Sequence, residues 1–88
     1  MPEISRFLNM VIQMYYLDHE DPHIHIMSPE TIGFCKVDFN GNILQGNLPK
    51  NKLRIIRKWI SMHEEELEYN WKISRDHINP ERIEPWIQ

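Results

Sequence analysis

The period of the apolar residues changes once along the chain, and this change constrains the fold more than any other feature. Between residues 23 and 39, apolar and polar side chains alternate with period two, which is typical of β-strands with one exposed face. From Pro49 onward, apolar residues recur every three or four positions, which is the spacing of an amphipathic helix. The sequence therefore predicts an α+β fold, in which a short antiparallel β-meander of three to four strands precedes helices packed on one face.

Three stretches of the N-terminal part predict strands. Residues 7–17 are rich in apolar strand formers, and either a buried strand or a short helix is compatible with them. In residues 23–27 the alternation places His23 and His25 on one face and the two isoleucines on the other. Residues 31–39 alternate in the same way, so a third strand is expected there.

Two short segments predict the turns around these strands. Ser28-Pro29-Glu30 separates the second strand from the third by its turn-forming composition. Asn40-Gly41 predicts a hairpin with a type I′ turn, because such a turn needs positive φ at both central residues. A short fourth strand is expected at residues 42–45.

The helical period extends from Pro49 to about Arg75, which is long for a chain of 88 residues. Either one long helix or two short helices with a break near residues 61–63 fits this length. A missing N–H is harmless at a first-turn position, where Pro49 is expected. We expect a single domain of residues 1–88. Its parts are a β-rich half (1–47), a helical half (48–76) and an extended C-terminal tail (77–88).

Composition excludes several classes of protein. No apolar run approaches the roughly 18–20 residues of a membrane span, so no membrane partner is expected. The first residues lack the basic and apolar regions of a signal peptide, which favours a cytoplasmic location. Cys35 is the only cysteine, so a disulfide within the chain is excluded.

Three histidines with the spacing His-x3-His-x-His are the first candidate for chemistry. His19, His23 and His25 would suit Zn²⁺ with an open fourth position, and Zn²⁺ is the cofactor to test. General acid–base use and purely structural hydrogen bonding are the two other interpretations. We favour a site without metal, because only three ligands are available.

His63 is the second candidate, because it shares the helical stripe with the apolar residues. A helix packed on the sheet would bring His63 toward His23 and His25. Two histidines suffice for metal-free RNA cleavage, one accepting the 2′-hydroxyl proton and one donating to the leaving oxygen. The alternative is that His63 fills a semi-polar gap in the packing.

The third candidate is a basic segment at the expected helix start. It contains Lys50, Lys52, Arg54, Arg57 and Lys58 within nine residues of a chain whose net charge is −3. Positive charge near a helix N-terminus opposes the macrodipole, so local stability does not explain these residues. Binding nucleic-acid phosphates or an acidic partner protein would explain them, and a solvated helix face is the third interpretation.

The tail raises the question of oligomeric state. Ile83, Trp86 and Ile87 are too apolar to remain in solvent, so they are expected to dock on the core or on another subunit. Because a core of this length has difficulty covering them all, we predict a homodimer.

Several segments resemble a small bacterial family, domain of unknown function 4160. The clearest is Pro22-His23-Ile24-His25, combined with Trp59-Ile60-Ser61-Met62-His63 in the helical half. The remaining similar segments are residues 1–7, 14–19, 46–49, 64–67, 70–71 and 82–85. The chain departs from the family at Asp21, where members usually carry the first proline of a pair.

The resemblance implies a partner but no settled chemistry. Members are often encoded beside a second small protein of family 2442, an arrangement similar to a toxin–antitoxin pair. One hypothesis is that this chain is the toxin component, acting on RNA through His23, His25 and His63 as a ribonuclease-like phosphodiesterase if it is an enzyme. The alternative is a non-catalytic module that docks the antitoxin-like product of the adjacent gene.

Overall fold

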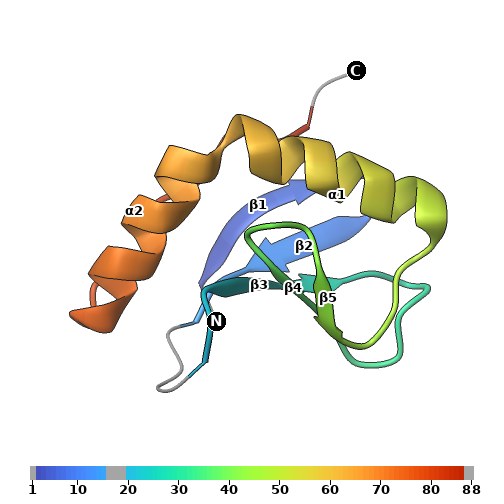
Figure 1. Cartoon of the computed structure of the whole chain (residues 1–88), viewed down its shortest axis with the longest axis horizontal. Coiled ribbons are helices and arrows are strands. Elements are labelled where there is room, and N and C mark those ends of the chain that lie inside the picture. Colours follow the sequence, from blue (N-terminus) through green and yellow to red (C-terminus); the bar gives the residue numbers. More distant parts are fainter. Residues whose placement is uncertain (1, 16–19, 87–88) are drawn as a thin grey trace.

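An antiparallel meander sheet and two helices make up the computed structural model, which describes residues 2–15 and 20–86 (Figure 1). In the described residues, the strands are β1 (Glu3–Phe7), β2 (Met10–Gln13), β3 (His23–Met27), β4 (Cys35–Asp38) and β5 (Ile43–Gln45). They lie in the sheet in sequence order. The helices α1 (Lys50–Met62) and α2 (Glu64–Arg75) follow, on one side of the sheet. The predicted α+β class is confirmed.

The sheet of the described residues has one strand more than the predicted three to four, because residues 7–17 contain a turn. Phe7 pairs with Met10, so Leu8 and Asn9 alone connect β1 to β2. Their φ angles are 51° and 61°, which is the positive φ pair of a type I′ turn. Leucine rarely adopts this conformation, so composition does not mark the turn, and the prediction of one continuous element was wrong.

β3 has the predicted bounds, whereas β4 begins four residues later than expected. The N–H of Thr31 donates to the carbonyl oxygen of Ser28 over 3.0 Å, which confirms the turn after β3. The hydroxyl of Thr31 donates to the same oxygen over 2.9 Å. Gly33 then has φ +84°, so the chain becomes extended only at Cys35.

The hairpin between β4 and β5 is present, but its turn is not type I′. Gly41 has positive φ, whereas Asn40 does not. The carboxylate of Asp38 accepts hydrogen bonds from the N–H groups of Asn40 and Asn42, each over 2.9 Å. This side-chain cap stabilises a three-residue loop in place of the expected two-residue turn.

The helical half is broken at His63, which lies between α1 and α2 with φ −126° and ψ 28°. Three glutamates occupy the first turn of α2, where negative charge favours a helix start. Pro49 is the residue before α1, not part of its first turn, and its ψ of 144° is extended. Neither described helix has the length and apolarity needed to cross a membrane.

Helix α1 covers the core face of the sheet. It buries Ile56, Trp59 and Ile60, and the ring centroid of Trp59 is 5.5 Å from that of Phe7. The strands contribute Ile4, Met10, Ile12, Ile24, Ile26, Cys35 and Val37, and α2 contributes Leu67 and Trp71. The two isoleucines of β3 therefore point to the core, as the alternation predicts.

The segment after α2 returns along the chain's own core. The N–H of Ile83 donates to the carbonyl oxygen of Ile4 over 2.7 Å, and the Ile83 side chain is 4% exposed. Trp86 packs partly buried against the same core, whereas Ile87 lies outside the described residues. The predicted docking on the core holds for these two residues, so they do not supply the reason given for a homodimer, which stays a prediction.

An ion pair also joins this C-terminal segment to β1. Arg82 contacts the carboxylate of Glu3 over 3.0 Å, and Arg6 contacts it over 2.7 Å. The hydrogen bonds from Arg6 and Arg82 hold the pKa of Glu3 at about 2.

Candidate functional site

The two histidines of β3 lie together, with ring centroids 5.2 Å apart, within the distance expected for neighbours on one face. The His23 side chain is completely buried, and its ring centroid is 5.3 Å from that of Trp71. Its Nδ1 is 2.7 Å from the carbonyl oxygen of Asp21 and donates to it, because a carbonyl oxygen only accepts. Its Nε2 has no hydrogen-bond partner among the described residues, although the carboxylate of Glu20 is 3.7 Å away.

His25 is held between two aromatic rings. Its ring stacks on Phe34 with centroids 4.5 Å apart, and the Tyr15 ring centroid is 4.8 Å away. Burial, and to a lesser degree the neighbouring His23, lowers the pKa of His25 from 6.5 to about 4. His25 is therefore neutral at pH 7, and a pKa this low makes its ring a weak base.

Acid will destabilise the fold through His25. Between about pH 6.5 and pH 4 the unfolded chain binds a proton at His25 that the folded chain does not, so the free energy of unfolding falls as the pH is lowered. Because the ring is partly exposed and screened, we expect this contribution to be about 1–2 kcal/mol. His25→Phe keeps the stacked ring without titrating, so its loss of stability in this range will be smaller.

Urea denaturation of both proteins at about pH 7 and pH 4.5 measures this difference. Carboxylates titrate equally in the two proteins, so only the contrast between them reports on His25. Equal losses of stability in wild type and His25→Phe would contradict the assignment.

A metal site has limited support from the described residues. Within residues 2–15 and 20–86, no three His, Cys, Asp or Glu side chains are arranged to hold a metal ion. His19, the third proposed Zn²⁺ ligand, lies outside the described residues. The nearby carboxylate of Glu20 has both oxygens 3.2 Å from the Lys36 ammonium, so it is already paired.

His63 makes its contacts at the junction of the two helices. Its Nδ1 is 2.7 Å from a carboxylate oxygen of Glu66, and its ring centroid is 5.3 Å from that of Trp59. None of the described ring contacts or hydrogen bonds joins it to His23 or His25. The structure therefore brings two of the three proposed catalytic histidines together and places the third among other partners.

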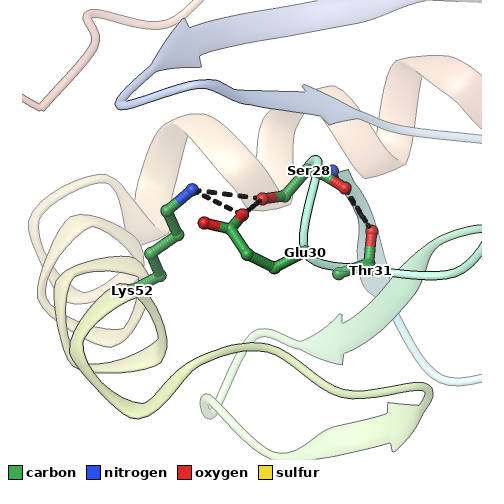
Figure 2. A network of polar contacts seen from close by, with 4 residues as sticks. All are labelled: Ser28, Glu30, Thr31 and Lys52. Atoms are coloured by element: carbon green, nitrogen blue, oxygen red, sulfur yellow. Dashed lines mark hydrogen bonds and ion pairs between the residues drawn. The ribbon is translucent and has the colours of Figure 1, made fainter.

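Two members of the basic segment tie α1 to the sheet. The Lys52 ammonium donates to Glu30 over 2.9 Å and to the Ser28 hydroxyl over 3.1 Å, while Ser28 also contacts Glu30 (Figure 2). Arg57 donates from Nε to the carbonyl oxygen of Gly41 over 2.9 Å. The side chains of these two cations therefore bond to other residues of the same chain.

The other three cations form what we call the basic face: Lys50, Arg54 and Lys58. All three are exposed, and none of their side chains has an ion pair or hydrogen bond with a described residue. Their spacing of four residues places them along one side of α1, about 6 Å apart in rise. The basic face is the part of the predicted segment that is free to bind.

A family model described as Domain of unknown function (DUF4160) matches residues 9–72. The chain belongs to the DUF4160 family. The match includes both histidines of β3, His63 and the whole basic segment. No curated protein and no solved structure matches the chain.

In this DUF4160 protein, the flank of α1 beside the basic face borders a cleft of about 360 Å³. The cleft is lined by Leu8, Asn9, Glu30, Asn51, Lys52 and Ile55. Leu8 is 42% exposed across the cleft from α1. Of these residues, sequence patterns indicated only Lys52, because nothing in the composition places the β1–β2 turn beside the helix.

Proposed function

We propose that this chain is a non-catalytic binding module, which docks an acidic surface of a partner protein on the basic face of α1. One observation supports this proposal. Some cations of the basic segment bond to other residues of the chain, whereas the others do not. The side chains of Lys52 and Arg57 bond to other residues of the chain, whereas the three side chains of the basic face bond to no described residue. The expected partner is the antitoxin-like product of the adjacent gene, which the family resemblance implies.

The basic face does not serve the stability of α1. The first turn of α1 contains no acidic residue, although negative charge there would favour the helix. Lys50 instead adds positive charge at the position where the macrodipole is least favourable to it. A negatively charged partner offsets this unfavourable term, so the arrangement favours a bound state.

A protein partner fits the surroundings better than RNA does. The first turns of α2 continue from α1 with exposed carboxylates, at Glu64, Glu65, Glu66 and Glu68. A phosphate backbone that extended beyond α1 along this surface would meet like charge. In addition, Met62 at the end of α1 is 65% exposed and offers apolar contact area for a protein.

The toxin interpretation, with RNA cleavage by His23, His25 and His63, has weaker support. Catalysis requires each group to reach the reacting atoms, and the His23 side chain is completely buried. One of its ring nitrogens is also occupied by the Asp21 carbonyl oxygen. RNA cleavage is therefore kept as the alternative outcome of the experiment below.

Charge reversal of the basic face will weaken the complex with the purified product of the adjacent gene. For Lys50→Glu, Arg54→Glu and Lys58→Glu combined, we expect about a thirtyfold higher Kd, because three rim charges contribute about 2 kcal/mol together. The salt dependence of Kd will also decrease. Isothermal titration calorimetry at two salt concentrations measures both effects.

The matched control is Lys72→Glu, a reversal at an exposed lysine of α2, for which we expect the wild-type Kd. An unchanged Kd in the triple variant would overturn the proposal. So would cleavage of RNA by the wild-type protein that His23→Ala abolishes, which would favour the toxin interpretation.

A further inference from the structure

The β1–β2 turn contains a leucine that folding alone does not explain. Leu8 has φ 51°, a left-handed conformation that is unfavourable for a side chain of its size. Its side chain remains 42% exposed, so burial offsets the cost of the strained backbone only in part. Strained residues persist where the surrounding structure or a function requires them.

Helix α1 presents two apolar residues along one flank, and the first of them lies beside this turn. Ile55 lines the cleft shared with Leu8, and Met62 follows seven residues later. Residues seven apart lie on the same side of a helix, so Ile55 and Met62 form the spacing of a helix–helix seam. Met62 is 65% exposed and Ile55 is half-buried. We call Leu8, Ile55 and Met62 the apolar flank.

The basic face borders the apolar flank along α1. At 100° per residue, Lys58 and Met62 differ by about 40° around the helix axis, and Arg54 lies about 40° further from Met62 than Lys58 does. A partner element lying along α1 would therefore place apolar side chains on the flank and charged ones beside these cations.

We infer that the apolar flank binds an acidic amphipathic helix of the partner protein. This inference rests on the proposed function, because it identifies the element that brings acidic groups to the basic face. The helical form of the partner follows from the seven-residue spacing of Ile55 and Met62, which matches successive turns of a second helix. Its acidic character follows from the side chains of Arg54 and Lys58, which have no partner in the part of the chain that the structure describes.

A second copy of this chain does not fit the same surface. Two copies joined through this flank of α1 would bring the basic face of each toward that of the other, and like charges at an interface oppose association. Charge complementarity therefore favours an acidic partner over self-association here.

The experiment uses the purified product of the adjacent gene and, in parallel, a labelled synthetic peptide. The peptide has three heptads, with leucine at positions a and d and glutamate at e and g, so that its own charge opposes self-association. Leu8→Asn removes an apolar contact but relieves strain, because asparagine tolerates positive φ. Met62→Gln removes the second contact from an exposed helical site.

We expect Leu8→Asn to raise the Tm by about 4 °C while weakening the binding of both probes about fivefold. Met62→Gln will weaken binding to a similar degree at an unchanged Tm. If Leu8 had a purely structural role, Leu8→Asn would not raise the Tm and weaken binding at the same time. Leu44→Gln, at an exposed apolar residue of β5, is the control and will bind like wild type.

The outcomes separate the two proposals. The gene product could bind in a charge-dependent way and bind equally well to Leu8→Asn and Met62→Gln. This result would overturn the present inference but would leave the proposed function standing. If the gene product does not bind, the proposed function fails and the peptide decides the inference. If the peptide binds and both variants weaken that binding, the result supports the apolar flank as the binding site. Two results would overturn the inference: no binding of the peptide, or equal binding of a peptide that has lysine in place of glutamate at e and g.

Discussion

Gly46→Ala will strongly destabilise the fold, whereas the same substitution at Gly33 will be tolerated. A Cβ at residue 46 would lie 2.5 Å from the carbonyl oxygen of Phe34 and 3.2 Å from the Cα of Cys35. Both are backbone atoms at the start of β4, so relief requires β4 and β5 to separate. With the φ of +81° at Gly46, we expect a loss of about 3 kcal/mol or more.

Gly33 is the matched control for this prediction. Its φ of +84° is nearly the same, but no atom lies within 4 Å of its added Cβ, so we expect a loss of only about 1 kcal/mol. Urea denaturation followed by tryptophan fluorescence gives both values. Equal losses would show that backbone conformation alone, and not the contact with Phe34, makes glycine necessary at residue 46.

Asn70→Ala will release the segment that returns along the core. The Asn70 side chain is 1% exposed, and its amide donates to the carbonyl oxygen of Glu81 and accepts from the N–H of the same residue, each over 2.8 Å. The substitution removes both bonds and leaves two backbone groups in a partly buried position without partners. We expect a loss of about 2–3 kcal/mol and faster proteolysis between α2 and Ile83.

Asn79→Ala, at an exposed residue of the same segment, serves as the control. It should change neither the urea midpoint nor the rate of proteolysis. Similar behaviour of the two variants would contradict an anchoring role for Asn70. If Asn70→Ala also forms dimers in light scattering, the released Ile83 and Trp86 supply the contact that was predicted for a homodimer.

Periodicity predicted the parts of the fold that depend on local pattern. The bounds of β3 were found because polar and apolar residues alternate there, which places Ile24 and Ile26 on the core face, although His23 on the other face is also buried. A break near residues 61–63 was among the predicted possibilities, because one helix from Pro49 to Arg75 would be long for a chain of this size. The β1–β2 turn was missed, because Leu8 adopts a conformation that its residue type disfavours.

The candidate site depended more on tertiary contacts than on pattern. A helical wheel separates Lys52 from the basic face, but the bond from Arg57 to Gly41 depends on where the β4–β5 hairpin packs. The pairing of His23 with His25 follows from their spacing in a strand. The position of His63 relative to them depends on the packing angle of the helices, for which the sequence has no local signal.

The hydrogen bonds that join residues 81–84 to earlier elements have a consequence for synthesis of the chain on the ribosome. Ile83 bonds to β1, and the Glu84 carbonyl oxygen accepts from the indole N–H of Trp59 over 2.8 Å. The β1 carbonyl and the Trp59 indole therefore lack these partners until residues 81–84 have been translated. Because folding generally proceeds from the N-terminus during synthesis, a nascent sheet that forms first keeps this side open until residues 81–84 emerge.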